Sequence, residues 1–205
     1  MNRVVLPEIL DHLDPADPAA LRSRSDLRRI HLLMGNSRWL HSAIPKDARS
    51  ILEIGAGEGC LVRSLSKQIP TARVTGVDLI PGPPDLNWQQ GDLFCILADT
   101  SDEVLVGMMI LHHFSDEQLR QLGSLLGNFQ SLFFCEPWRS PVSLYLGAAM
   151  SPFFNSVTRH DLPTSVKAGF RQGELPGLLG LNERDWQLTE SIDWRGALRL
   201  RAIRK

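Results

Sequence analysis

The amino-acid sequence predicts an α/β protein built around a parallel sheet, and three observations carry this prediction. From residue 50 onward, short apolar runs alternate with amphipathic helical stretches. A glycine-rich turn follows the first apolar run directly, and two alternating segments near the C-terminus are joined near Gly196. Alternating strands and helices are typical of β-α-β units, whose right-handed crossovers place the strands side by side in one sheet.

Each predicted strand is a short apolar run bounded by polar or turn-forming residues. The runs lie at 50–54, 72–77, around 86–90, 103–109 and 131–135. The helices between them show apolar residues at helical spacing, namely Leu61, Val62, Leu65 and Ile69 after the first strand and Leu119, Leu122, Leu125 and Leu126 after the fourth. At the C-terminus, 185–194 and 197–203 alternate with a period of two and predict an edge hairpin.

With 205 residues, the chain is long enough for one well-buried core and short for two. We therefore expect a single domain with four parts. Residues 1–48 form N-terminal helices that cap the core, 49–136 form the ligand-binding core, 137–183 are an insertion, and 184–205 are the terminal hairpin. The proline-rich stretch 14–18 predicts a turn before the first long helix.

The composition is that of an ordinary folded protein, with 43% hydrophobic and 22% charged residues. The formal net charge of −1 gives no global electrostatic reason to expect a nucleic-acid partner, which favours a small-molecule substrate. The N-terminus lacks a signal-peptide pattern and no apolar run could span a bilayer, so we expect a cytoplasmic protein. An oligomeric state does not follow from these patterns.

The three cysteines, Cys60, Cys95 and Cys135, are far apart in the sequence and each lies in or beside an apolar run. Their spacing does not match a metal-binding pattern. We expect reduced thiols in the core and no metal site.

The strongest functional signal is the segment Ile51–Gly59, in which a buried strand runs straight into a glycine-rich turn and then into a helix. Glycines let the backbone turn tightly and approach a ligand without an intervening Cβ atom. Asp78 ends the next predicted strand about 20 residues further on, where a carboxylate can accept hydrogen bonds from both hydroxyls of a ribose. The sequence therefore predicts a nucleoside-containing cofactor.

The turn itself, Glu-x-Gly-x-Gly-x-Gly at residues 53–59, differs from the Gly-x-Gly-x-x-Gly of dinucleotide enzymes. It resembles the first motif of class I S-adenosylmethionine-dependent methyltransferases, and the likeness extends through Val77–Leu79, Gly91–Leu93 and Leu111–Phe114. The resemblance covers about residues 48–136. It implies a Rossmann-like, seven-stranded, mostly parallel sheet in the order 3-2-1-4-5-7-6, with S-adenosylmethionine as cofactor and S-adenosylhomocysteine as product.

The resemblance also implies roles for residues in and after the glycine turn. Gly55, Ala56 and Gly57 would lie against the cofactor, and Glu53 would orient the loop or the methionine amino group. Asp78 would hold the ribose, with Leu79 beside it.

Three further positions complete the implied cofactor site. Asp92 would accept a hydrogen bond from the adenine amino group, and the backbone of Leu93 would lie on the ring edge. A turn-forming role of Asp92 is the alternative. Met108, after the fourth strand, stands where many relatives carry a small polar residue or an acid, which is a departure from the family pattern.

The segment 111–118, Leu-His-His-Phe-Ser-Asp-Glu-Gln, is similar to a His-Asp-Trp-Ser-Asp-Glu segment of aromatic O-methyltransferases, in which the leading histidine is the general base. His112 aligns with that base, and an imidazole can take a proton from a phenol-like hydroxyl. His113 and His160 are further catalytic candidates. The structural alternative is that Ser115 caps the next helix and the histidines orient its entrance.

Substrate contacts are expected from two places. Glu136 and Arg139 follow the fifth strand at the sheet edge that faces the ligand in open α/β sheets, with a surface ion pair as the alternative. Within the insertion, the polar candidates lie among Phe153, Phe154 and Phe170, or else form salt bridges that hold the loop. These candidates are Arg159, His160, Arg171 and Glu174.

Taken together, the patterns favour an O- or C-methyltransferase that acts on an aromatic, quinone-like or polyketide-derived metabolite, similar to the ubiquinone and menaquinone methylases or other secondary-metabolite methyltransferases. The chain lacks the Asn/Asp-Pro-Pro-Tyr/Phe motif with which base N-methyltransferases hold the target nitrogen. The alternatives are methylation of RNA or protein, and a module that binds the nucleoside but has lost catalysis.

Overall fold

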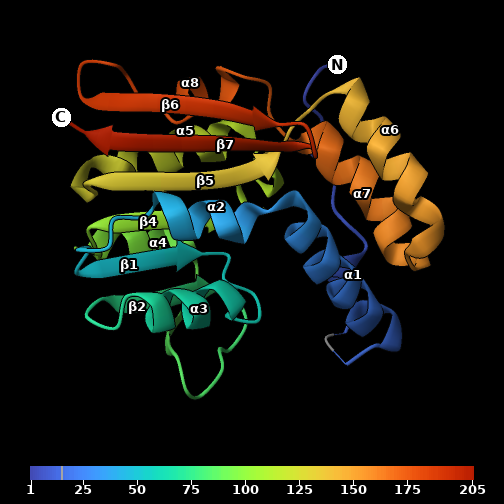
Figure 1. Cartoon of the computed structure of the whole chain (residues 1–205), viewed down its shortest axis with the longest axis horizontal. Helices are drawn as coiled ribbons and strands as arrows, with labels where there is room; N and C mark the ends of the chain where they lie inside the picture. Colours follow the sequence, from blue (N-terminus) through green and yellow to red (C-terminus); the bar gives the residue numbers. More distant parts are fainter. Residues whose placement is uncertain (15) are drawn as a thin grey trace.

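The structure, a computed structural model, describes residues 1–14 and 16–205, so Pro15 of the predicted N-terminal turn lies outside the described residues. Seven strands form one sheet in the order β3-β2-β1-β4-β5-β7-β6, which confirms the predicted topology (Figure 1). The strands are β1 (Ser50–Ile54), β2 (Arg73–Asp78), β3 (Asn87–Gln90), β4 (Val104–Met108), β5 (Ser131–Pro137), β6 (Trp186–Asp193) and β7 (Ala197–Arg204).

Five strands are parallel and the C-terminal hairpin is antiparallel. β1 pairs in parallel with β2 and β4, β2 with β3, and β4 with β5. β7 runs antiparallel to both β5 and β6. Because β7 pairs as far as Pro137 opposite Ala197, β5 extends two residues beyond the predicted strand end, and Glu136 lies within the strand.

Helices cover both faces of the sheet, and the alternation along each strand decides which side chains face which layer. Ile51 packs with α2 (Asn36–Ala43) and α3 (Cys60–Gln68) on one face. Leu52 and Ile54 pack with the helices of the other face, which are α4 (Leu93–Asp99), α5 (Asp116–Leu125) and α8 (Glu174–Leu178). These two apolar layers supply the main hydrophobic stabilisation.

A third group of helices lies beyond the carboxyl ends of the parallel strands. The group consists of α1 (Pro18–Met34), α6 (Pro141–Met150) and α7 (Ser156–Ala168), and the arrowheads of β1 and β5 point toward it (Figure 1). The predicted N-terminal helices and the insertion therefore meet at the edge of the sheet where ligands bind in open α/β folds. The insertion is largely helical rather than an irregular loop.

The expectation that all three cysteines lie in the core is wrong. Cys135 is buried, but Cys60 and Cys95 are exposed because they occupy outward positions at the starts of α3 and α4; all three are free thiols. Among the tryptophans, Trp194 is 74% exposed at the hairpin turn, so it is not a core residue. In the part of the chain that the structure describes, no helix is long and apolar enough to cross a membrane.

Candidate active site

The glycine turn after β1 depends on left-handed backbone conformations. Gly55, Gly57 and Gly59 have φ values of 65°, 54° and 71°, a region that side chains with a Cβ atom rarely adopt. A Cβ atom on Gly55 would lie 2.5 Å from a side-chain carbon of Ile110. On Gly57, a Cβ atom would point into space where no described atom lies within 4 Å. A Cβ atom on Gly59 would likewise lie 2.5 Å from a side-chain carbon of Leu86, so two glycines of the turn pack against protein and Gly57 borders an open space.

Asp78, at the end of β2, is fixed by two backbone amides. Its Oδ2 accepts a hydrogen bond of 2.7 Å from the Gly57 amide, and its Oδ1 accepts one of 3.3 Å from the Ile80 amide. The Ala56 amide also donates to the Val77 carbonyl. These bonds hold the end of β2 against the glycine turn, so the acid predicted to bind a ribose lies beside the open space at Gly57.

Glu53 lies under the same turn and is almost fully buried. Burial raises the pKa of its carboxyl group to about 8, partly offset by a hydrogen bond from the Val62 backbone, and the nearby Asp78 charge raises it further. Among the described residues no group hydrogen-bonds to Oε2 of Glu53. A buried oxygen without a partner is costly, and a cationic or N–H-bearing ligand group would supply the missing bond. The turn therefore fits the methionine end and ribose of S-adenosylmethionine.

The other predicted cofactor residues surround this turn without forming further bonds toward it. Asp92 is exposed and caps α4, accepting a hydrogen bond of 2.8 Å from the Phe94 amide. Leu79 is 74% exposed beside Asp78, and Leu93 is partly buried. Met108 is partly buried, with its sulfur 3.8 Å from Oγ of Ser37.

His112 and Glu136 form a buried pair at the carboxyl ends of β4 and β5. Nδ1 of His112 lies 2.8 Å from Oε2 of Glu136, and that carboxylate also accepts bonds from the Ile110, Leu111 and His112 amides at 3.0, 2.8 and 3.2 Å. Glu136 therefore holds the whole turn that carries the histidine. Since Nδ1 faces a carboxylate, its hydrogen bond leaves Nε2 as the ring atom available to other groups.

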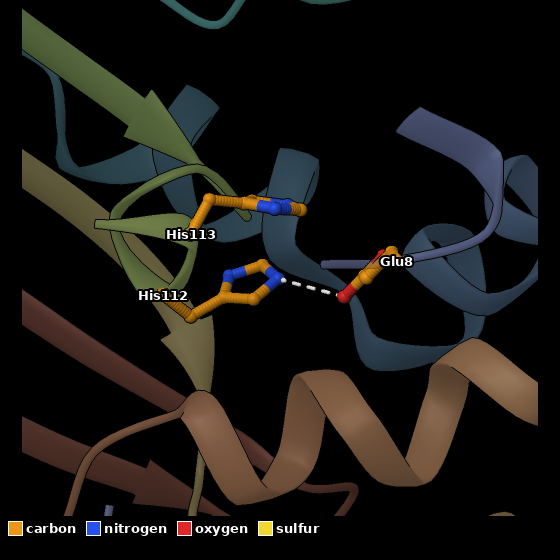
Figure 2. A group of neighbouring side chains, drawn as sticks. All are labelled: Glu8, His112 and His113. Carbon is orange, nitrogen blue, oxygen red and sulfur yellow. Dashed lines mark ion pairs between the residues drawn. The ribbon is translucent and has the colours of Figure 1, made fainter. Parts of the chain in front are cut away.

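Two carboxylates of the N-terminal segment complete the cluster: Glu8, which Figure 2 shows beside the two histidines, and Asp11. Oε1 of Glu8 lies 3.7 Å from Nε2 of His112, and Oδ2 of Asp11 lies 3.5 Å from Nδ1 of His113. The two imidazole rings are tilted against each other with centroids 4.2 Å apart. Glu8, His112 and His113 bring possible ligand atoms within 4.8 Å of one another, but an ion pair between Glu8 and His112 already balances charge without a cation.

Charge and burial act in opposite directions on this cluster. Burial by itself would lower the pKa of His112, but hydrogen bonds and charges from Glu136 and Glu8 outweigh it and raise that pKa to about 9. Burial raises the pKa of Glu8, but His112 and His113 bring it below the usual value. Both shifts describe an imidazolium held between two carboxylates. Across the cavity, burial and the His112 charge lower the pKa of His31 to about 4.

A cavity of about 440 Å³ adjoins His112 and His113. Its walls come from α1, α6, α7, the hairpin turn and the N-terminal segment, and most of the lining is apolar. Ile110, which packs on Gly55, belongs to the same short turn as His112, so this turn connects the glycine loop to the cavity. The apolar walls include Leu27, Ile30, Leu146, Met150, Leu162 and Val166.

Six of the predicted catalytic and substrate-contact residues lie outside this cavity lining, namely Glu136, Arg139, Arg159, His160, Arg171 and Glu174. Arg139 is buried and donates to the Gly169 carbonyl, the Met1 carbonyl and Glu174, so it anchors the insertion. Arg159 is exposed and donates to the Phe154 carbonyl, His160 is exposed and pairs with Asp161, and Arg171 is exposed. Neither arginine makes the contact of its structural alternative: Arg139 is buried and pairs with Glu174 instead of forming a surface ion pair with Glu136, and Arg159 bonds to a backbone carbonyl instead of to an acid. Phe170 is fully buried and Phe153 points to solvent.

The structural alternative for the histidine segment is also present. Ser115 accepts a bond from the Gln118 amide, and the Gln118 side chain accepts one from the Ser115 amide, which is a complete capping box for α5. The predicted helix start is therefore confirmed, while His112 and His113 lie on the preceding turn and line the cavity. Capping by Ser115 and a role of His112 in the cavity are compatible.

Several cavity residues were not predicted from the sequence. Glu8 lines the cavity and Asp11 pairs with His113; both lie more than 100 positions from the histidines, with nothing in their local pattern to mark them. His31 and Asp161 line the cavity from α1 and α7, where most of the other lining residues are apolar. Met109 has φ of 58°, which is unusual for a residue with a side chain and costs about 1–2 kcal/mol. The Gly-Met-Met run at the end of β4 did not signal that conformation.

No protein-family model matches the chain, and no curated protein matches it in sequence. Similar solved structures share its fold. The plantazolicin methyltransferase BpumL, in complex with a triazolic desmethylPZN analogue and S-adenosylhomocysteine (SAH), is 15% identical, with a TM-score of 0.67 over 93% of this chain and 92% of that chain.

Two larger proteins are also similar in structure. The pyocyanin biosynthetic protein PhzM is 16% identical, with a TM-score of 0.67 over 97% of this chain and 62% of that chain. Human N-acetylserotonin methyltransferase, in complex with SAM, is 15% identical, with a TM-score of 0.58 over 94% of this chain and 60% of that chain. At these identities the comparisons establish the fold, which is the one expected from the resemblance to class I methyltransferases.

Proposed function

We propose that the chain is an S-adenosylmethionine-dependent methyltransferase that acts on a small molecule. One observation carries the proposal: the buried His112–Glu136 pair lies between a glycine turn with an unpartnered carboxylate oxygen and a largely apolar cavity. A cofactor site, a proton acceptor and an acceptor pocket thus adjoin along one short stretch of chain. The names of the similar structures, which include methyltransferases in complex with SAH or SAM, support this assignment.

Residues of the glycine turn and the neighbouring strand ends would hold the cofactor. Asp78 would accept from the ribose, Glu53 from the methionine amino group, and Asp92 from the adenine amino group, while the open space at Gly57 admits the ligand to the backbone. When bound, the cofactor supplies an electrophilic methyl group on a sulfonium.

His112 would act on the acceptor. Glu136 fixes Nδ1, so Nε2 is the ring atom that faces the acceptor. Once the imidazolium, whose pKa is about 9, has lost its own proton, Nε2 can take the proton of a hydroxyl or an acidic C–H group, and the oxygen or carbon that loses the proton becomes the nucleophile. Alignment of the reactants in a pocket that excludes water supplies the rest of the rate enhancement. His113 lines the same cavity and would contact the acceptor, whereas His160 would need to rotate inward to do so.

The cavity supports a more specific proposal for the acceptor. Its mostly aliphatic and thioether lining suits a flat apolar molecule, and the polar groups gather at the histidine end. We therefore infer that an aromatic, quinone-like or polyketide-derived metabolite places an acidic hydroxyl or carbon at His112. Since no basic side chains besides Arg195 and the histidines line the described cavity, an RNA acceptor is disfavoured.

The test is a methyl-transfer assay on the purified chain with a panel of hydroxylated aromatics, quinols and 1,3-diketones, read by mass spectrometry. The proposal predicts a gain of one methyl group on a subset of the panel and release of S-adenosylhomocysteine. Tight cofactor binding without transfer to the panel, to RNA or to protein would instead support the inactive binding module. Transfer to RNA alone would contradict the acceptor assignment.

A further inference from the structure

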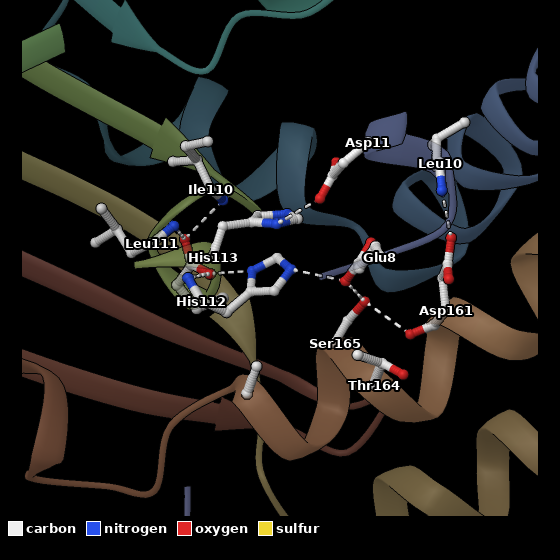
Figure 3. Close-up of polar contacts among 12 residues, drawn as sticks. Glu8, Leu10, Asp11, Ile110, Leu111, His112, His113, Asp161, Thr164 and Ser165 are labelled. Atoms are coloured by element: carbon white, nitrogen blue, oxygen red, sulfur yellow. Dashed lines mark hydrogen bonds and ion pairs between the residues drawn. The ribbon is translucent and has the colours of Figure 1, made fainter. Parts of the chain in front are cut away.

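The first twelve residues, here the N-terminal strap, lie against the turn that carries His112 and against α7 (Figure 3). Arg3 fastens the strap: its guanidinium donates to the carbonyls of His112, Phe114 and Ala168 and pairs with Asp116. The guanidinium also lies 4.6 Å above the ring of Phe170. The strap is therefore bound directly to the histidine turn.

Asp161 of α7 fixes the strap again, next to Glu8. Its two carboxylate oxygens accept hydrogen bonds from the Ile9 and Leu10 amides at 2.9 and 3.0 Å. Ser165, one helical turn further along α7, donates to Glu8 itself. These contacts leave the Glu8 side chain buried and directed at Nε2 of His112 (Figure 3).

The two carboxylates that face His112 differ in what else they hold. Glu136 accepts from three backbone amides as well as from Nδ1, so its charge maintains the turn and the orientation of the ring. Among the described residues, the carboxylate of Glu8 pairs with side chains, namely those of Ser165 and His112. Glu8 also borders the cavity at the ring atom that the acceptor must reach, whereas Glu136 lies behind the ring.

We propose that Glu8 is a positioning residue of the methyl transfer: the strap places its carboxylate against Nε2 of His112 and thereby sets the pH range in which His112 can accept the acceptor's proton. This inference rests on the proposed function of His112. In the step concerned, the O–H or C–H bond of the acceptor breaks, its electron pair stays on the nucleophilic atom, and the proton forms the Nε2–H bond of an imidazolium. Glu8 stabilises that imidazolium before the proton leaves for solvent.

Four titratable groups of the described residues face His112 and affect its protonation. Glu136 comes from β5, Glu8 from the strap, His113 from the same turn and His31 from α1. The negative charges of Glu136 and Glu8 outweigh the effect of burial, since the pKa of His112 is raised to about 9. Burial lowers the pKa of His112, and without the Glu8 charge only Glu136 acts against it. The proton should therefore leave His112 at lower pH.

The experiment compares wild-type protein with Glu8→Gln, which keeps the shape of the side chain and removes its charge. Imidazole NMR signals, assigned with His112→Gln and recorded with a chelator present, give the titration midpoint of His112. We expect Glu8→Gln to lower that midpoint by about one pH unit or more, the range for a close opposite charge. The acidic limb of kcat/KM against pH should move by the same amount, and Glu8→Asp should move both part of the way back.

Asp11→Asn is the matched control, because it removes one charge from the same strap but from beside His113. It should shift the His112 midpoint by less than half as much as Glu8→Gln does. Equal shifts in the two variants would overturn the proposal, because the effect would then come from the net charge of the strap.

Two other results would also overturn it. An unchanged His112 midpoint in a folded Glu8→Gln protein would show that Glu8 does not control the ring. A shifted midpoint with an unmoved kcat/KM limb would show that His112 is not the base, which is a failure of the proposed function and not of the contact. Circular dichroism and the melting temperature establish that each variant is folded.

Discussion

The Nδ1 atom of His112 lies 2.8 Å from Oε2 of Glu136, and both side chains are buried at the carboxyl ends of adjacent strands. The contact joins two segments that are 24 residues apart in sequence. It fixes one ring nitrogen and turns the other toward the cavity, as in base–orienter pairs in which a carboxylate holds the imidazole. His112 precedes the capped start of α5, and because Glu136 orients its ring, this position is compatible with a role as a base.

Replacement of this histidine should separate catalysis from cofactor binding. His112→Gln should lower the methyl-transfer rate by about 10²–10⁴-fold, because the acceptor's proton loses its base. The affinity for S-adenosylmethionine should stay near that of the wild type, since the glycine turn is untouched. Fixed-time assays of the methyl-transfer rate and calorimetric measurement of the cofactor affinity are made on the same preparation.

His160→Gln is the matched control for that substitution, because His160 is exposed on α7 and lies outside the cavity lining. Its turnover should equal that of the wild type. Normal turnover of His112→Gln with a reduced melting temperature would remove the catalytic assignment and leave only a structural role at the helix entrance.

Glu136→Ala should lower the stability of the protein more than a substitution of His112 does. The carboxylate accepts bonds from three buried amides, and each bond to a charged group contributes about 1.5–3 kcal/mol. We expect the free energy of unfolding in urea to fall by at least about 3 kcal/mol, together with a loss of activity. A variant with wild-type stability would show that the turn is held by other contacts.

The open space at Gly57 can be tested with a control of equal backbone strain. Gly57→Val places a branched side chain where the ligand must approach, so cofactor binding should be lost. Gly180 also has a positive φ and open space at its Cβ position, but lies after α8. Gly180→Val should cost similar stability and leave the cofactor affinity unchanged. Normal binding by folded Gly57→Val would make the loop an ordinary turn.

The cofactor affinity should rise with pH between about 6 and 8. The pKa of the Glu53 carboxyl is raised to about 8, so this group is neutral at pH 6 and must lose its proton to pair with a methionine ammonium. Binding should therefore release a proton below pH 8, and the dependence should disappear in Glu53→Gln. Calorimetry in buffers of different ionisation enthalpy measures the released proton. A pH-independent affinity in the wild type would place the amino group elsewhere.

The sequence was sufficient for the sheet because strand and helix patterns are local. The periodicity of 50–54 and 61–69 and the hairpin at Gly196 all appear in the structure. The geometry of the glycine turn was equally predictable, since Gly55, Gly57 and Asp78 are constrained by backbone geometry that has a sequence signature.

The acceptor side was harder to predict because it is assembled from distant segments. Glu8 reaches His112 across 104 positions only because Arg3 and Asp161 fasten the strap, and such side-chain contacts leave no periodic pattern. In the insertion, charged residues drew attention, yet Arg159 and Arg171 are exposed while the cavity is lined by Leu162 and other apolar residues of α7. Only the helical periodicity of α7 separates the exposed residues from those that face the cavity, and no helix was predicted for this segment from the sequence.

The most direct test of the central claim is calorimetric titration of S-adenosylmethionine and S-adenosylhomocysteine into wild type, Asp78→Ala and the control Asp85→Ala. Asp85 is an exposed acid just before β3 that pairs with Arg63. We predict one binding site in the wild type, the same affinity in Asp85→Ala, and binding weaker by about 1.5–3 kcal/mol, or roughly 10–150-fold, in Asp78→Ala. No binding to the wild type, or equal binding by Asp78→Ala, would contradict the account.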